Sequence, residues 1–316
     1  MIQKRTIGLV GTGNVGVAAG YAMFLNGTAG EIIFIDKNHR RAEGEAMDMM
    51  HGQPYVSNIK VRAGNYADLK AAQVIIISAG VGQRPGENRM DLLNRNVTVL
   101  NEIVSQLDQH APDAILLIAS NPVDILTYAV QQMSKRPNHH VIGTGTMLDS
   151  GRFRVLLGQH YGVDPRSVHA YIVGEHGDTE VPLWSSAIIG GIPIMYNSVL
   201  GKAFEQEEMD QLFVKVRDAA YEIVDRKGYT STAIGSVIAR LSAAILNDQK
   251  SIFTVSVRLS GDYNLTNVCL SIPCVIGLKG VEAKILPKLN DQEKDGLEKS
   301  AAFLYQRLEE IGMSSS

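Results

Sequence analysis

Cysteine is scarce in this chain of 316 residues, which contains only Cys269 and Cys274. Two cysteines can build neither a disulfide framework nor the usual ligand set of a structural zinc site. We therefore expect no metal centre. We also expect a reducing compartment, in which disulfides are rare.

Long apolar runs are missing as well. The longest candidates, residues 74–77 and 114–119, have the length of strands and fall far short of a membrane-spanning helix. Glycines at positions 8, 11, 13 and 16 interrupt the apolar stretch that a signal peptide would need near the start. We expect a cytoplasmic protein without a membrane partner.

The chain has no excess of one charge. Its 30 Lys and Arg residues against 33 Asp and Glu residues give a net charge of −3. This balance supplies no broad basic field of the kind that attracts nucleic acids or anionic membranes. We expect no nucleic-acid partner, while a local basic site for a small anion stays open.

The first half of the chain does contain short apolar runs that alternate with helical stretches. Strands are predicted at 6–10, 31–35, 59–63, 74–78, 115–119 and 141–143, and helices at 15–26, 41–51, 91–110 and 122–134. Continuous apolar strands separated by helices are typical of a parallel sheet covered on both faces. The predicted fold is a Rossmann-type, doubly wound α/β sheet.

The pattern changes near residue 147, and we place a domain boundary between 145 and 146. The second half has predicted strands at 168–173, 187–189, 253–259 and 269–276, and helices at 147–161, 205–227 and 231–247. A last amphipathic helix begins near Asp291 and ends before Gly312. These elements predict an α+β domain with antiparallel hairpins.

A G-x-G-x-x-G motif, GTGNVG, follows a predicted strand and opens a predicted helix. Gly11 permits the tight turn, Gly13 lets the backbone approach a pyrophosphate, and Gly16 lets helix and strand pack closely. Asp36 lies 20 residues beyond Gly16, at the end of the second strand. A carboxylate there accepts hydrogen bonds from a ribose diol and repels a 2′-phosphate, which predicts NAD rather than NADP. The alternative is a plain glycine turn and an exposed Asp.

Three further segments carry polar residues suited to catalysis. The glycine-rich, basic loop 79–89 follows a strand and suits a mobile lid, although a plain surface loop fits too. Asp149 and Arg152 lie at i and i+3 on one helix face, where an ordinary ion pair is the alternative. His176, in Gly-Glu-His-Gly-Asp, is poorly explained by packing. A buried Asp would set its tautomer, and Asp149 is the candidate.

Taken together, GTGNVG, Asp36, GQRPGENR, SNPVD, LDSGRFR and GEHGD resemble the motifs of the L-lactate/malate dehydrogenase family, almost end to end and in the same order. The resemblance implies an NAD-binding Rossmann domain at 1–145 and a substrate domain at 146–316. It also implies reversible hydride transfer between NADH and a 2-oxo acid.

The same resemblance implies the roles of the site residues. His176 matches the proton donor and acceptor, an imidazole that titrates near neutrality and serves both directions. Asp149 matches its orienting partner. Arg152 matches the arginine that grips the substrate carboxylate with a bidentate fork. Arg89 matches the lid arginine that polarises the carbonyl, and is both catalytic and substrate-binding.

Other matched positions complete the two binding sites. Asn121 matches an amide that contacts the substrate oxygen and the nicotinamide ribose, and Thr230 matches a hydroxyl near the substrate side chain. The positions that match the lining of the cofactor groove are Val15, Arg41, Tyr66, Gly80, Val81 and Thr144.

Gln83 decides between the two substrates of the family. Malate enzymes place an arginine here for the second carboxylate, whereas this chain has a neutral amide beside Arg84. Burying an unpaired carboxylate against an amide would cost several kcal/mol. The residues therefore favour pyruvate and L-lactate, with slightly larger 2-oxo acids allowed, since one CH₂ is worth only ~0.8 kcal/mol.

Arg154 and His169 match positions at which bacterial members of the family bind fructose 1,6-bisphosphate between subunits. The alternative is a helix-surface Arg and a strand-end His. The resemblance also implies a homotetramer.

Three other functions compete with this interpretation. A malate dehydrogenase is separated by Gln83. An NAD-dependent glycosidase shares this kind of cofactor domain but generally needs a metal, for which the two cysteines offer no evident pair. A non-catalytic NAD-sensing protein would have no need to keep His176, Asp149, Arg152 and Arg89 together.

Overall fold

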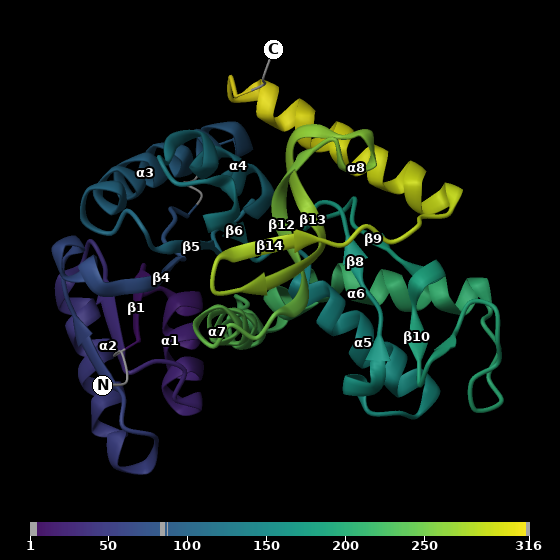
Figure 1. Cartoon of the computed structure of the whole chain (residues 1–316), viewed down its shortest axis with the longest axis horizontal. Helices are drawn as coiled ribbons and strands as arrows, with labels where there is room; N and C mark the ends of the chain where they lie inside the picture. Colours follow the sequence, from purple (N-terminus) through teal and green to yellow (C-terminus); the bar gives the residue numbers. More distant parts are fainter. Residues whose placement is uncertain (1–4, 83–85, 87, 314–316) are drawn as a thin grey trace.

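The computed structural model describes residues 5–82, 86 and 88–313, and the side chain of Arg89 lies outside this description. The central feature is a nine-stranded sheet in the order β14-β13-β12-β6-β5-β4-β1-β2-β3 (Figure 1). Its parallel part consists of β1 (Thr6–Val10), β2 (Glu31–Ile35), β3 (Lys60–Ala63), β4 (Ala72–Ile77), β5 (Ile115–Ile118) and β6 (Val141–Gly143). The predicted doubly wound α/β class is confirmed.

Helices follow β1, β2, β4 and β5, because each of these apolar strands ends in a turn that leads into an amphipathic or alanine-rich segment. They are α1 (Asn14–Asn26), α2 (His39–His51), α3 (Arg89–His110) and α4 (Val123–Met133). The middle strands β1, β4 and β5 are almost completely buried, as expected for a parallel sheet covered on both faces. The carboxyl ends of β1, β4 and β5 therefore open at one edge of the sheet, where ligands of such folds bind.

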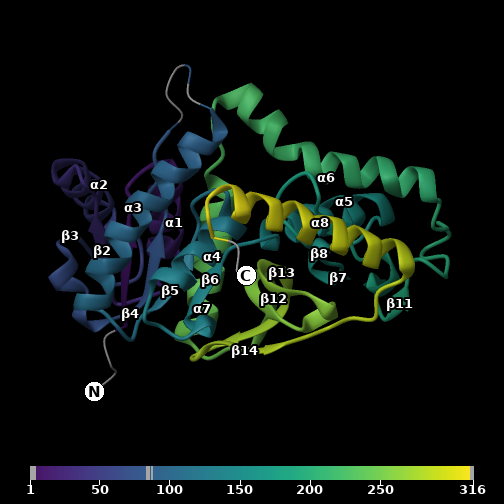
Figure 2. The same ribbon diagram turned by 90° about the horizontal axis from the view of Figure 1, so that it is seen from above.

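The second half supplies α5 (Met147–Tyr161), α6 (Gln206–Lys227), α7 (Thr232–Leu246), β12 (Ser251–Ser260), β13 (Thr266–Gly277), β14 (Gly280–Lys284) and α8 (Asp291–Glu310). Helix α7 packs on α1 so closely that a Cβ on Gly235 would lie 2.7 Å from the Ala18 carbonyl carbon. Helix α8 crosses over β13 (Figure 2). The two halves of the chain are thus packed together.

The antiparallel hairpin of the second half does not form a separate sheet. Strand β12 pairs with β6 through Ser256 and Gly143, so β12, β13 and β14 extend the central sheet. Gly143 allows this approach, because a Cβ there would lie 2.7 Å from the Ser256 Cβ. The sequence had predicted the hairpin but not its attachment.

The predicted strand 168–173 was wrong as a single element. It is divided into β7 (Val168–His169) and β8 (Ile172–Val173), which belong to different small sheets. Strand β7 pairs with β10 (Ile188–Ile189), which pairs with β11 (Ile192–Pro193), whereas β8 pairs with β9 (Val181–Pro182). The apolar run 168–173 thus contributes strands to two different sheets. The periodicity of its side chains alone does not reveal this division.

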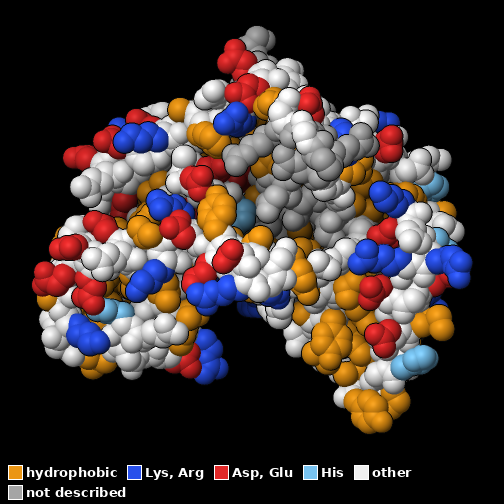
Figure 3. All heavy atoms as spheres, turned by 180° about the vertical axis from the view of Figure 1, so that it is seen from behind, with side chains coloured by type: hydrophobic (Ala, Val, Ile, Leu, Met, Phe, Trp, Pro, Cys, Tyr) orange, Lys and Arg blue, Asp and Glu red, His pale blue; other side chains and the backbone are white. Residues whose placement is uncertain are grey.

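Short 3₁₀ turns join several elements, at Gln53–Tyr55, Tyr66–Ala71, Asn138–His140, Pro165–Ser167, Trp184–Ser186 and Asp262–Asn264. On the face drawn in Figure 3, basic and acidic side chains are interspersed. Among the described residues, none of the helices has the length and hydropathy needed to cross a membrane.

Candidate functional site

The glycine loop after β1 has the geometry of a phosphate cradle. Gly11 has φ +100°, and a Cβ on it would lie 2.6 Å from the Ala79 backbone nitrogen. A Cβ on Gly16 would collide with the Gly11 carbonyl oxygen, whereas one on Gly13 would meet no atom of the described residues within 4 Å. Among the described residues, no side chain caps the start of α1. Open space therefore faces free N–H groups and the positive end of a helix dipole, which fits a pyrophosphate.

Asp36 stands at the end of β2, beside this loop. Its Oδ2 accepts hydrogen bonds from the Thr12 amide at 2.7 Å and the Thr12 hydroxyl at 2.9 Å. Burial would raise the pKa of this carboxyl, but the hydrogen bonds from Thr12 and Asn38 hold it below its usual value. The group is therefore ionised and held in place, as ribose recognition requires.

The remaining residues predicted to line the cofactor groove are distributed around the same edge of the sheet. Val81 follows β4, and its amide donates to Asn96 at 2.9 Å. Gly80 approaches the same side chain, since a Cβ on it would lie 3.1 Å from Asn96 Oδ1. Thr144 is buried just after β6. Val15 and Arg41 lie in or near the first turns of α1 and α2, and the half-buried Tyr66 follows β3.

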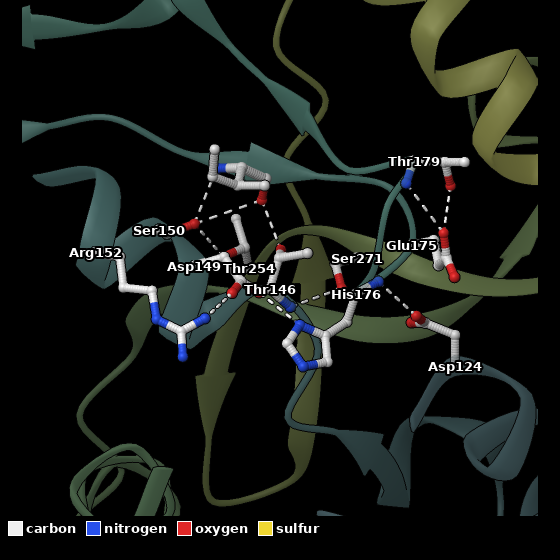
Figure 4. A network of polar contacts seen from close by, with 11 residues as sticks. Asp124, Thr146, Asp149, Ser150, Arg152, Glu175, His176, Thr179, Thr254 and Ser271 are labelled. Atoms are coloured by element: carbon white, nitrogen blue, oxygen red, sulfur yellow. Dashed lines mark hydrogen bonds and ion pairs between the residues drawn. The ribbon is translucent and has the colours of Figure 1, made fainter. Parts of the chain in front are cut away.

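The structure brings together the three charged residues from the second half. His176 Nδ1 lies 2.6 Å from Asp149 Oδ2, and Arg152 Nη1 donates to Asp149 Oδ1 at 2.7 Å (Figure 4). Asp149 and Arg152 come from the first two turns of α5, and His176 follows β8. Asp149 and His176, which are 27 positions apart in the sequence, thus belong to one cluster. At its centre lies the Asp149 carboxylate, whose side chain is only 3% exposed.

Asp124 holds the backbone of His176 in place, and the sequence analysis did not identify it. Its Oδ2 accepts a hydrogen bond from the His176 backbone amide at 2.7 Å. It lies in the first turn of α4, after the Asn121–Pro122 cis peptide, and it is completely buried. Burial raises the pKa of Asp124 to about 6. The sequence feature that could have identified Asp124 is an acidic residue among apolar ones in the SNPVD segment.

The cluster changes how His176 titrates. Burial disfavours the imidazolium, but the Asp149 carboxylate, with Asp124 and Glu180 adding to it, raises the pKa of His176 to about 9. Burial likewise opposes ionisation of Asp149, yet His176 and Arg152 hold its pKa below the usual value. The sequence had predicted an imidazole that titrates near neutrality, so the structure shifts this expectation upward.

The structure describes the other residues predicted to bind the substrate only in part, or does not join them to His176. Gln83 lies outside the described residues, as does the side chain of Arg89, whose backbone opens α3. Asn121 is exposed between β5 and α4, and the partly buried Thr230 lies between α6 and α7. Within the described part of the chain, no hydrogen bond joins Asn121 or Thr230 to His176.

The two residues considered for an effector lie apart from this cluster. Arg154 lies on α5, two residues beyond Arg152, and His169 is exposed on β7. The Arg154 Nε is buried and has no hydrogen-bond partner among the residues described.

Comparison with known proteins matches the chain along nearly its whole length. Residues 5–143 match the family model of the lactate/malate dehydrogenase NAD-binding domain, and residues 146–313 match that of the lactate/malate dehydrogenase alpha/beta C-terminal domain. An L-lactate dehydrogenase of Salinibacter ruber is 58% identical over 305 residues, covering 96% of both chains. One of Thermus aquaticus is 44% identical, covering 94% of this chain and 96% of that protein.

A solved structure agrees with these relatives. The ligand-bound minor L-lactate dehydrogenase of Enterococcus mundtii has 40% identity and a TM-score of 0.94, covering 97% of this chain and 98% of the other.

Proposed function

The chain belongs to the lactate/malate dehydrogenase family, and we propose that it reversibly transfers a hydride between NADH and pyruvate to give L-lactate and NAD, with His176 as proton donor and acceptor. The observation that carries this role is the 2.6 Å contact between His176 Nδ1 and Asp149 Oδ2. The matched NAD-binding domain and the fit of the glycine loop give the cofactor.

The residues divide the reaction between them. NADH, when bound, supplies the hydride. Asp149 occupies Nδ1 of His176 and stabilises the imidazolium, so Nε2 is the atom that gives its proton to the carbonyl oxygen. Arg152 bonds Asp149 through Nη1, and its other N–H groups hold the substrate carboxylate. In the proposed site, Arg89 polarises the carbonyl, Asn121 contacts its oxygen, and Thr230 lies near the substrate side chain.

The substrate is tested by comparing 2-oxo acids. With NADH, pyruvate should be reduced with a kcat/KM at least about 10²-fold above that of oxaloacetate, because Gln83 cannot pair a second carboxylate. A 2-oxo acid such as 2-oxocaproate measures side-chain breadth. Gln83→Arg is the matched variant and should move the preference toward oxaloacetate. A wild type that prefers oxaloacetate would make the malate reaction the correct one.

The pH profile is expected to follow His176. Pyruvate reduction needs the imidazolium, so the titration of His176 should lower its kcat/KM above the pKa of about 9, by up to about tenfold per pH unit. Lactate oxidation needs the neutral imidazole and should instead rise with pH through the same range. Steady-state assays in both directions measure the two limbs. A flat profile for reduction, with hydride transfer limiting, would contradict the role of His176.

We further propose an assembly and an effector. A homotetramer is consistent with Arg154 and His169 holding fructose 1,6-bisphosphate between subunits, and the unpartnered, buried Arg154 Nε supports an anion there. Pyruvate saturation curves with and without the bisphosphate, in the assay above, test this effect.

The domain division between residues 145 and 146 is supported by the two separate family models. A cytoplasmic location is supported by the free cysteines Cys269 and Cys274.

A further inference from the structure

The carboxyl group of Glu180 is buried near the proposed site, but the mechanism does not use it. Glu180 follows His176 by four residues, and its amide donates to the Gly177 carbonyl at 3.3 Å, closing the turn that carries His176. The residue is only 7% exposed. Its Oε1 has no hydrogen-bond partner among the residues that the structure describes. A buried, unpartnered carboxyl oxygen next to a reactive site needs an explanation.

The carboxyl of Glu180 interacts electrostatically with the charged cluster. The next residue, Val181, pairs with Val173 and packs on α8, where a Cβ on Gly296 would lie 3.0 Å from it. Glu180 lies immediately before β9, at the end of the turn that carries His176. Four charged groups act on it there, Asp149 and Arg152 of α5, His176, and Arg217 of α6.

This environment favours the uncharged acid. Burial, with the charge of Asp149 adding to it, raises the pKa of Glu180 to about 8, while His176, Arg152 and Arg217 oppose the rise. An uncharged acid also explains why an unpartnered Oε1 is tolerated, since burying a neutral oxygen costs far less than burying a carboxylate. The other acidic groups near this cluster are Asp124 behind His176, and Glu175 and Asp178 in the same loop.

We propose that Glu180 is a positioning residue that sets the charge of the substrate site through Arg152 and His176. As an uncharged acid it leaves both cations to the substrate carboxylate. As a carboxylate it competes with the substrate for them, so that the affinity for a monocarboxylate falls at alkaline pH. The proposal about substrate affinity rests on the proposed function, whereas the protonation of Glu180 does not.

Infrared spectroscopy tests the protonation without any turnover. A protonated carboxyl gives a carbonyl stretch at higher frequency than the carboxylate bands. The wild-type-minus-E180Q difference spectrum should contain this band near pH 7 and lose it by about pH 10. Absence of the band near pH 7 would overturn the proposal. The matched control is Glu175→Gln, because Glu175 is a partly buried acid of the same loop whose carboxylate accepts a hydrogen bond from the Thr179 amide.

Steady-state kinetics tests the consequence for pyruvate. In the wild type, log kcat/KM for reduction should fall in two alkaline steps, one from Glu180 and one from His176. The first should amount to about tenfold and lie mainly in KM. E180Q should match the wild type within about twofold near pH 6.5 and show the His176 step alone. E180D, which still ionises, and E175Q should keep both steps.

The outcomes separate the two proposals. A folded E180Q enzyme that loses pyruvate affinity near pH 6.5, or that keeps both alkaline steps, would refute the charge-setting role. If E180Q does not fold, a protonated-carboxyl band that is lost between about pH 7 and pH 10 in both the wild type and E175Q still decides the point. If the wild type does not reduce pyruvate at all, the proposed function fails, while the infrared result still reports on Glu180.

Discussion

Replacing His176 with glutamine is expected to lower kcat/KM for pyruvate reduction by roughly 10³-fold, which corresponds to about 4 kcal/mol of transition-state stabilisation. Glutamine keeps a hydrogen-bonding side chain of similar reach, but it cannot hold a proton for transfer. The carbonyl oxygen would then gain negative charge without a proton donor. The pH dependence of reduction above about pH 8 should change at the same time, because the group that titrates at a pKa of about 9 is gone.

A control separates loss of chemistry from loss of structure. Binding of NADH, followed by its fluorescence, should be unchanged in H176Q, since the phosphate cradle at 11–16 lies between β1 and the first turn of α1 and not on the loop after β8. Asp149→Asn should also be severe, because the amide removes the charge that stabilises the imidazolium at 2.6 Å. An H176Q enzyme that reduces pyruvate within tenfold of the wild type would mean that another group donates the proton.

The fold could be predicted where a run of apolar residues forms a single strand of one sheet. Thr6–Val10, Glu31–Ile35 and Val141–Gly143 are strands with the predicted bounds, because each is a buried apolar run. Prediction failed at 168–173, where two sheets share a run. It also missed β14 (Gly280–Lys284), because its partly exposed Glu and Lys residues hide the strand pattern.

The proposed site, like the fold, could be predicted only in part from the sequence. Motif order pointed to His176, Asp149 and Arg152, and the structure places these three in one cluster. Asp124 and Glu180 were missed, because their importance depends on what faces them across the fold. A buried carboxyl near a helix start or a strand start gives the same sequence pattern whether it bonds a backbone amide or faces a cation.

In the proposed mechanism the guanidinium of Arg152 binds both Asp149 and the substrate carboxylate, and this leads to the second large expected effect. Arg152→Lys should lower kcat/KM for pyruvate by roughly 10²-fold or more, about 3 kcal/mol, although the charge is kept. A lysine ammonium has no planar fork with which to hold Asp149 and the substrate carboxylate together. The Asp149 carboxylate is already in place, buried and adjacent on α5, so it would draw the ammonium away from the substrate.

The measurement is a comparison of pyruvate saturation curves, in which R152K should show its main change in KM and retain the alkaline limb that belongs to His176. Arg166→Lys is the matched control, since Arg166 is an exposed arginine that pairs with Asp164 on the surface. It should leave both constants within about twofold. An R152K enzyme with a KM near the wild-type value would show that the helix ion pair with Asp149 is the whole role of Arg152. The substrate carboxylate would then need another cation, and Arg89, the arginine proposed to polarise the carbonyl, would be the first to examine by the same substitution.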